Sequence, residues 1–173
     1  HTSLNILDNT SKTLQVETDE LPNKIKQIQT DHTEALSNSK TLETKLIQLQ
    51  LDKKLETTIL INNIPVLITD VTTTNAKLLR DITDWYIERN PNGIIILAAT
   101  TNSRVNLIVR ASKNLTSQGI HAGDIVSTIS NIVDGKGGGN PTLGQGGGNN
   151  TLKLNEALLE ASEIIKRTLS EQI

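Results

Sequence analysis

The sequence predicts an α/β (α+β) chain in which a helical hairpin or coiled-coil extension precedes a small mixed sheet with packed helices. Three patterns favour this class. Apolar residues recur at heptad spacing in the first third, short apolar runs alternate with amphipathic stretches after it, and a glycine-rich segment separates the last two helical patterns. We therefore expect a helical subdomain over residues 1–56 and a globular domain over residues 57–173.

The first third has the heptad pattern of a helix with one apolar seam. The seam residues are Leu4, Leu7, Leu14, Leu21, Ile25, Ile28, Ala35, Leu42, Leu46 and Leu49. Residues 15–22 interrupt the pattern, and Pro22 is tolerated only in the first turn of a helix, so we expect a short helix followed by a long one ending near Leu55. The pattern favours a helical hairpin that covers its own stripe. A dimer seam or a spacer is the alternative. The seam contains four polar residues, which would make a coiled-coil dimer weak.

The globular part is expected to begin with a β-hairpin. The apolar residues 58–61 and 64–71 flank Asn62 and Asn63, which tolerate the positive φ of a tight turn. An amphipathic helix is expected over residues 75–89, with Trp85 and Tyr86 as core anchors and not as platforms for stacking bases.

Two further strands and two helices follow in the pattern. The continuous apolar run 94–99 is short enough for a strand buried on both faces, and a turn over 101–104 leads to a strand over 105–110. We expect a helix that starts at 119–123 and ends near Val133, and a last helix over 154–169.

Composition excludes several classes of protein. The chain has no cysteine, so disulfides and cysteine-bound zinc are excluded. No apolar run reaches the roughly twenty residues that a membrane helix needs, so we expect no membrane partner and a cytoplasmic location, or a mitochondrial one in a eukaryote. Because the chain starts at His1 and contains no methionine, we expect it to be a fragment of a longer protein.

Charge is nearly balanced. Residues 1–56 contain seven Lys and nine Asp plus Glu, and residues 57–173 contain ten residues of each sign. A general electrostatic attraction to nucleic acid is therefore absent, and any RNA contact depends on a few locally placed cations.

Motifs for catalysis are missing. The three histidines, His1, His32 and His121, have no metal-ligand spacing, so we expect no metal, no cofactor and no catalytic residue. His121 and Asp124 lie at the entry of an amphipathic helix, where a solvent-facing or capping role is favoured. Lys136 is followed by Gly137 and not by Ser or Thr, so the glycine-rich segment is no nucleotide P-loop.

The glycine-rich segment, residues 134–150, is the most unusual stretch. Its two triplets, Gly137 to Gly139 and Gly146 to Gly148, have Gly135 and Gly144 beside them in a chain with eleven glycines. A tightly folded loop with amides at a surface is predicted, because Pro141, Leu143 and Gln145 interrupt the glycines as they would not in a flexible linker. Three hypotheses remain open: close packing between two helices, a cradle for phosphate or ribose, or part of a hydrolase.

This segment also carries a resemblance to a known family. With Ala122-Gly123-Asp124 before it and Leu154 to Leu158 after it, the segment resembles the C-terminal end of alanyl-tRNA synthetases, on a module shared with the DHH phosphoesterases. Residues 21–25 resemble the start of the helical subdomain in the same synthetases. Asn140 stands where that family usually has arginine, and Gly144 where it usually has alanine. The phosphoesterases have histidine at the place of Asn140, and this chain has no Asp-His-His motif.

The resemblance implies a noncatalytic domain of an enzyme that is an alanine–tRNA ligase. Such a domain contacts the outer corner of tRNA and helps to link aminoacylation with editing. The implied partners are tRNA(Ala), the remaining domains of the same synthetase, and a second copy through the helical subdomain. Two other classes stay open: a nucleic-acid-holding domain of a DHH-type phosphoesterase, and a purely dimerising structural domain.

We expect RNA recognition through backbone and shape, because aromatic platforms are scarce. Lys136 matches the family motif directly, whereas four other cations are chosen from predicted strand ends, turns and loops. The expected RNA-binding residues are Lys136, Gly137, Gly138, Gly139, Asn140, Gln145, Gly146, Gly147, Arg104, Arg110, Lys113 and Lys153.

Overall fold

The computed structural model describes residues 2–73, 75–101 and 103–170, which fall into two compact units, His1–Lys45 and Leu46–Ile173. Helix α1 (Thr2–Leu14) and the first part of α2 (Leu21–Leu55) belong to the first unit, and the last turns of α2 belong to the second. The expected division between residues 56 and 57 stays a prediction, because compactness alone does not show independent folding.

The second unit contains the predicted mixed sheet. Its strand order is β1-β2-β3-β4-β6-β5, and β2 and β3 pair in parallel while all other neighbours are antiparallel. The strands are β1 (Ile59–Ile61), β2 (Ile64–Val71), β3 (Ile94–Thr100), β4 (Val105–Ala111), β5 (Gly135–Gly139) and β6 (Leu143–Gly148). The α/β class that the sequence predicts is confirmed.

Local sequence explains how the first half of this sheet forms. The β1–β2 turn has Asn62 at φ 49° and Asn63 at φ 63°, the positive values predicted for a two-residue hairpin. Helix α3 (Ala76–Arg89) begins where the Asn75 side chain accepts hydrogen bonds from the amides of Lys77 and Leu78. This helix is the crossover that allows β2 and β3 to run parallel.

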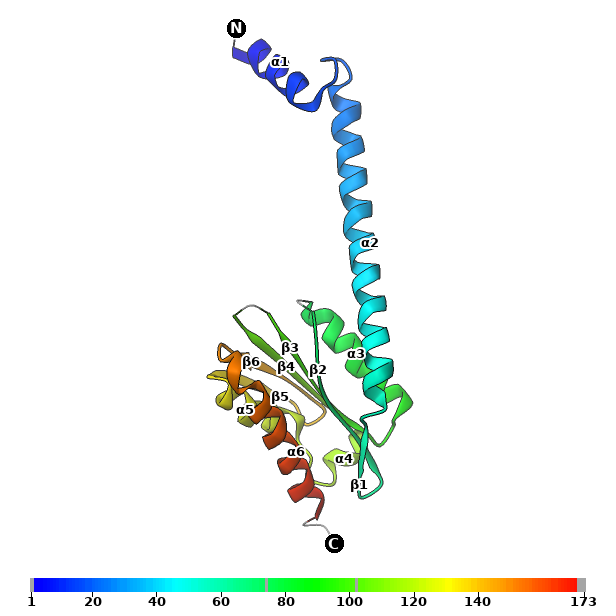
Figure 1. Cartoon of the computed structure of the whole chain (residues 1–173), viewed down its shortest axis with the longest axis vertical. Helices are drawn as coiled ribbons and strands as arrows, with labels where there is room; N and C mark the ends of the chain where they lie inside the picture. Colours follow the sequence, from blue (N-terminus) through cyan, green and yellow to red (C-terminus); the bar gives the residue numbers. More distant parts are fainter. Residues whose placement is uncertain (1, 74, 102, 171–173) are drawn as a thin grey trace. The chain divides into compact units, whose positions relative to one another are not determined.

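Helices cover both faces of the sheet. In Figure 1, α5 (Ala122–Ile132) and α6 (Leu154–Ser170) lie on one face and α3 on the other. The sheet separates two buried apolar clusters, so the described side chains of β3 from Ile94 to Ala99 are fully buried. Tyr86 anchors the α3 side with no exposed surface, whereas Trp85 is half-buried beneath the Arg89 guanidinium, 4.1 Å from its ring centre.

The sequence missed two short elements of this unit. Helix α4 (Lys113–Thr116) and the 3₁₀ turn η1 (Thr151–Lys153) were not predicted. Asn102 of the predicted 101–104 turn lies outside the described residues.

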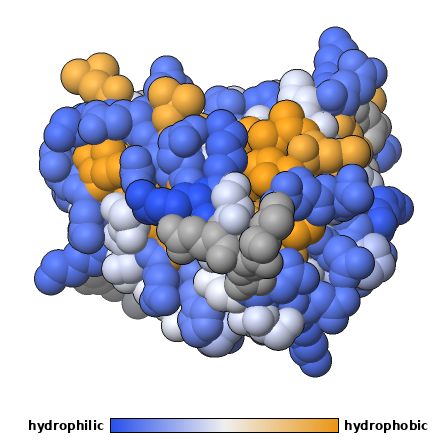
Figure 2. All heavy atoms as spheres, turned by 90° about the horizontal axis from the view of Figure 1, so that it is seen from below, coloured by the Kyte–Doolittle hydropathy of each residue, from blue (hydrophilic) through white to orange (hydrophobic). Residues whose placement is uncertain are grey.

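On the face shown in Figure 2, apolar residues form separate patches among polar ones.

The end of α2, which belongs to the second unit, packs there through apolar side chains and through an ion pair. Ile47 is 1% exposed within the α3-side cluster, and Lys54 Nζ donates to Asp70 Oδ1 of β2 at 2.8 Å. This hydrogen bond, together with the lysine charge, holds the pKa of Asp70 below its ordinary value, against the opposing effect of partial burial.

The Lys54–Asp70 pair predicts a pH dependence of stability. A carboxyl whose pKa is lower in the folded state stabilises the fold above its unfolded pKa, and this contribution is lost as pH falls through the folded pKa. We expect parent protein to be more stable than Asp70→Asn at pH 7 and the difference to be smaller at about pH 3, below the ordinary pKa of aspartate. Urea unfolding at both pH values measures this. The difference is small, because the Asp70 side chain is 63% exposed, and an equal difference at both pH values would contradict the expectation.

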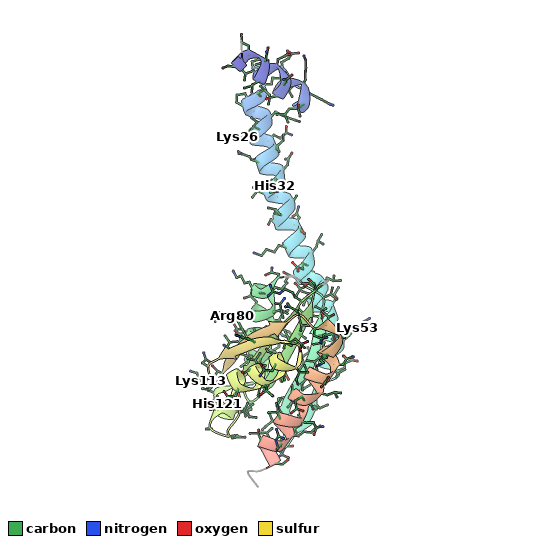
Figure 3. The ribbon with its side chains drawn as sticks, turned by 90° about the vertical axis from the view of Figure 1, so that its left-hand side faces the viewer. Lys26, His32, Lys53, Arg80, Lys113 and His121 are labelled. Atoms are coloured by element: carbon green, nitrogen blue, oxygen red, sulfur yellow. The ribbon has the colours of Figure 1, made fainter. Side chains whose placement is uncertain are left out.

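The first unit contains the two predicted helices. Lys26 and His32 project from α2 as exposed side chains, and His32 occupies one of the polar positions of the seam (Figure 3). Most apolar seam residues of this unit are also exposed: Leu4, Leu7, Ile25, Ile28 and Leu42. The apolar stripe is therefore largely exposed to solvent. A second copy of the helix can pack on it as in a coiled coil, which is the alternative to a hairpin that covers its own stripe.

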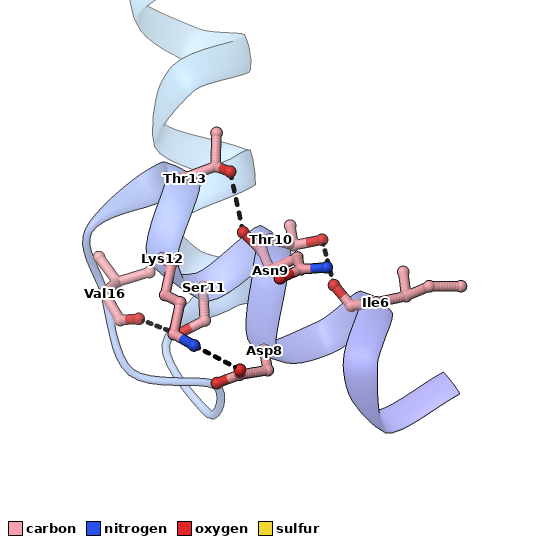
Figure 4. A network of polar contacts seen from close by, with 8 residues as sticks. All are labelled: Ile6, Asp8, Asn9, Thr10, Ser11, Lys12, Thr13 and Val16. Carbon is pink, nitrogen blue, oxygen red and sulfur yellow. Dashed lines mark hydrogen bonds and ion pairs between the residues drawn. The ribbon is translucent and has the colours of Figure 1, made fainter. Parts of the chain in front are cut away.

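Helix α1 bonds polar side chains to its own backbone (Figure 4). Thr10 Oγ1 donates to the Ile6 carbonyl at 2.7 Å, and Lys12 Nζ pairs with Asp8 at 2.7 Å. The helix ends at Leu14, and the next residue, Gln15, has a φ of 53°, the left-handed conformation common after helix C-termini.

Candidate nucleic-acid interface

The predicted glycine loop is wrong in its local structure. Residues 135–148 form an antiparallel hairpin, with β5 at the edge of the sheet and β6 between β5 and β4. Many of its amides therefore serve the strand ladder, and they are not all free at a surface. Glycines occupy most positions of both strands. The two faces of this hairpin differ in what lies against these glycines.

One face of the hairpin is pressed against α5, and we call it the α5 face. A Cβ at Gly137 would lie 2.6 Å from Ser130 Oγ and 2.8 Å from the Val126 carbonyl oxygen. A Cβ at Gly146 would lie 2.3 Å from the same hydroxyl. These glycines are required because the helix backbone approaches the strands too closely for any side chain. The hypothesis of close packing thus explains the α5 face.

The opposite face of the hairpin, the open face, carries Lys136, Gly138 and Gln145. Alternate residues of a strand share a face, and Gly138 pairs with Gln145 in the register of β5 and β6. All three residues are exposed, while α3 packs against β3 and β4. A Cβ at Gly138 would have no atom within 4 Å. Close packing therefore does not explain the absence of a side chain at this position.

The outer edge of β5 presents backbone groups. The Asn140 amide donates to the Leu143 carbonyl at 2.9 Å, which makes these residues a hydrogen-bonded pair. Since such pairs alternate along an antiparallel ladder, the backbone groups of Gly137 and Gly139 point away from β6. They face the edge of the sheet, where β5 has no further strand neighbour among the described residues. Part of the predicted amide surface is therefore present as a strand edge.

Asn140 closes the turn between the two strands. Its Oδ1 accepts from the Thr142 amide at 2.9 Å, the Thr142 hydroxyl at 3.0 Å and the Leu143 amide at 2.9 Å. Asparagine in place of the family's usual arginine thus has a local explanation, because its short side chain folds back onto the turn. Its RNA contact stays a prediction.

We expect Asn140→Ala to lower the free energy of unfolding by about 1–2 kcal/mol, because the turn amides lose their acceptor. Thr142→Val tests the hydroxyl alone and should cost less. Denaturant unfolding of both variants measures the difference, and an unchanged midpoint in Asn140→Ala would show that the turn does not depend on this side chain.

A shallow hollow of about 350 Å³ lies at the start of the hairpin. It brings together two of the predicted cations, Arg104 and Lys136, with Gly146 and Gly147. The hollow is also lined by Asn106, Asp134, Asn149 and backbone of neighbouring residues. The Asp134 carboxylate accepts from Asn150 Nδ2 at 2.8 Å. Two exposed cations beside glycine backbone provide local charge for a phosphate in a unit with no net charge.

The remaining predicted cations lie elsewhere. Arg110 is on β4 and forms an ion pair with Asp84 of α3 at 2.9 Å. Lys113 follows β4 and Arg104 precedes it, so they lie at opposite ends of the strand, about 20 Å apart. Lys153 is exposed in η1 and is not one of the residues that line the hollow. Lys136 and Arg104 thus lie at one hollow, and the other three predicted cations do not line it.

His121 occupies the N-cap position of α5 without a side-chain cap bond. It is exposed at the start of α5, makes no side-chain cap hydrogen bond, and its Nδ1 lies 3.7 Å from Asp124 Oδ2 (Figure 3). The predicted solvent-facing position is confirmed, and the predicted cap is confirmed in position but not as a side-chain hydrogen bond. Within the described ranges, no three His, Asp or Glu side chains converge as metal ligands, and no helix is long and apolar enough to cross a membrane.

A protein-family model named DHHA1 domain matches residues 63–167, more than half of the chain. The chain belongs to the DHHA1 domain family. The matched range of this DHHA1 domain includes the whole hairpin, α5 and every residue that the sequence singled out for RNA binding.

Proteins similar to this DHHA1 domain chain confirm the synthetase resemblance. The chain is 30% identical to the alanine–tRNA ligase of Oceanobacillus iheyensis over 98% of its own length and 19% of that protein. It is 31% identical to the Bacillus pumilus alanine–tRNA ligase over 96% of the chain and 19% of that protein. The chain spans about a fifth of the length of these relatives.

A solved structure with the same fold is the C-Ala domain of Aquifex aeolicus alanyl-tRNA synthetase. The TM-score is 0.53 at 22% identity, over 62% of this chain and 93% of that domain. The likeness shows the fold of the DHHA1 domain, including its mixed sheet with packed helices.

Sequence reasoning missed several residues of the DHHA1 domain site. Asn106 lines the hollow because its side chain alternates with those of Val105 and Leu107 along β4. Asp134 has a φ of 56°, a conformation that aspartate tolerates directly before a glycine strand. Strand alternation could have indicated Asn106. Ser130, whose buried hydroxyl lies beneath two glycines, had no signal in the sequence.

Proposed function

We propose that the chain is a noncatalytic, tRNA-binding C-terminal domain of an alanine–tRNA ligase. The observation that carries this proposal is similarity to alanine–tRNA ligases along 98% of the chain, which extends through both the helical and the globular unit. A phosphoesterase role has less support, because Asn140 replaces the histidine of that family and is engaged in a turn.

The hairpin supports binding to an RNA backbone. Its open face carries Lys136, the hollow beside it adds Arg104, and the outer edge of β5 presents backbone amides. Such groups recognise phosphate and sugar without reading base sequence. Trp85 is partly covered by Arg89 and Tyr86 is buried, so neither offers a free platform for stacking bases.

The proposed mechanism is positional. The domain holds the elbow of tRNA(Ala) while the acceptor end reaches either the aminoacylation site or the editing site in the rest of the parent protein, in the cytoplasm. Binding energy at a remote point of a substrate is used in this way to orient its reacting end.

Binding of two RNAs to the chain tests this proposal. We expect full tRNA(Ala) to bind at low salt and a minihelix that lacks the elbow to bind at least about tenfold more weakly. Fluorescence anisotropy of labelled RNA measures both affinities. Equal binding of the two RNAs would contradict elbow recognition, and absence of binding to either at low salt would contradict the RNA-binding function.

Self-association is a second candidate function, favoured by the exposed stripe of the first unit. Leu4, Ile25, Ile28 and Leu42 expose 43% to 70% of their surface, although such residues usually become buried when helices pair. We expect the mass of the chain in analytical ultracentrifugation to rise with concentration. Ile28→Glu should shift this equilibrium toward monomer by about tenfold, and the neighbouring Gln29→Glu should not. A mass that stays monomeric at all concentrations would exclude this function.

A further inference from the structure

We propose that the open face of the hairpin reads ribose: one ribose of the RNA lies over Gly138, and Gln145 hydrogen-bonds its 2′-hydroxyl. Lys136 and Arg104 hold a neighbouring phosphate at the hollow. This inference rests on the proposed RNA-binding function and adds discrimination between RNA and DNA to it.

Gly138 differs from the other glycines of the hairpin in what surrounds it. An added Cβ would approach another atom to within 3 Å at each of the other seven glycines between residues 135 and 148, but would meet nothing within 4 Å at Gly138. Gly138 also does not have the positive φ that would demand glycine. Neither backbone conformation nor packing within the chain therefore requires glycine here. A flat object that approaches the strand would require it.

Gln145 is placed to recognise a hydroxyl on such an object. It pairs with Gly138 of β5, which offers no side chain on that side, and with the buried Ile108 of β4 on the other side. The residue is exposed, and its amide group makes no hydrogen bond among the described residues. An amide supplies both a donor and an acceptor, which matches the donor and acceptor capacity of a 2′-hydroxyl.

Lys136 lies on the same face, two residues before Gly138 along β5. This spacing places the two Cα atoms about 7 Å apart, within reach of a lysine side chain that contacts the phosphate next to the ribose. Arg104 lines the same hollow as Lys136. The cations thus lie toward the hollow and Gln145 lies beside Gly138, an order that suits one phosphate followed by one sugar.

Ribose recognition follows from the chemistry of this surface. The phosphate contacts of Lys136 and Arg104 are the same in RNA and DNA, whereas only ribose offers a hydroxyl to Gln145. Loss of one such hydrogen bond between uncharged groups weakens binding by about fivefold.

Single 2′-deoxy substitutions in the elbow of tRNA(Ala) test this inference. Transcripts that each lack one 2′-hydroxyl are bound to the parent chain, to Gln145→Met and to Gly138→Ala. We expect one position at which the deoxy substitution weakens binding to the parent by about fivefold and has no effect on Gln145→Met. Methionine keeps the length of the side chain and removes both polar atoms. Gly138→Ala should weaken binding of unmodified tRNA by about tenfold.

The outcomes separate this inference from the function on which it rests. If the parent binds tRNA but no elbow position is sensitive, or if the same positions are sensitive in Gln145→Met, ribose reading by Gln145 is overturned and tRNA binding stands. Unchanged affinity of Gly138→Ala also overturns it. If the parent binds neither tRNA nor minihelix, the proposed function fails as well. Neither variant should melt below the parent, because both positions are exposed.

Discussion

Gly137→Ala is expected to destabilise the second unit by about 2–3 kcal/mol and to lower its melting temperature by about 10 °C. The added Cβ would lie 2.6 Å from Ser130 Oγ and 2.8 Å from the Val126 carbonyl oxygen. The carbonyl belongs to the backbone of α5, so relief of the contact requires the helix and strand to separate. Thermal unfolding followed by circular dichroism measures the effect.

Gly138→Ala is the matched control for this prediction. The two glycines are neighbours in one triplet and lose the same backbone freedom in the unfolded chain, but they face opposite sides of the sheet. We expect Gly138→Ala to keep the parent's melting temperature or to raise it slightly. Equal destabilisation of the two variants would show that glycine is needed for backbone conformation and not for contact with α5.

The second large effect concerns RNA affinity. Lys136→Ala is expected to weaken binding of tRNA(Ala) about five- to tenfold at low salt and to reduce the slope of log affinity against log salt by about one. The reason is that this exposed lysine is one of only two predicted cations at the hollow. Titrations at four or more salt concentrations measure the slope. Lys136→Arg retains the charge and should retain the slope.

Arg110→Met is the control for Lys136→Ala, because it also removes one positive charge from the chain but at a paired arginine. Arg110 is 27% exposed and is paired with Asp84, so we expect its replacement to leave the salt slope unchanged. The free energy of unfolding should fall slightly, because Asp84 loses its partner. A slope that changes more in Arg110→Met than in Lys136→Ala would place the RNA beside α3 and β4, away from the hairpin.

Much of the fold was predictable because local rules decided it. The paired asparagines, Asn62 and Asn63, specify the β1–β2 turn, and the uninterrupted apolar run from Ile94 specifies a buried strand. The helix patterns before and after the glycine segment also correspond to α5 and α6. In each of these cases the residue type and its spacing carry the information.

The glycine segment could not be placed from its own residues. Glycine has no side chain, so it provides neither the alternation of a strand nor the periodicity of a helix. Its conformation depends on β4, which pairs with β6, and on α5, which packs against both strands of the hairpin. Strand propensity disfavours glycine, and here tertiary pairing overrides it.

The sequence by itself determined the α/β class, the order of most helices and strands, and the similarity of the glycine run to alanyl-tRNA synthetases. Only the tertiary structure decided which glycines serve packing and which leave a surface open, because that division depends on how close α5 and the neighbouring backbone come to each glycine. It also decided that Lys136 and Arg104 share a hollow while Arg110 is paired with Asp84. Residues so far apart in the chain become neighbours only through the pairing of strands and the packing of α3 on the sheet, which no local pattern encodes.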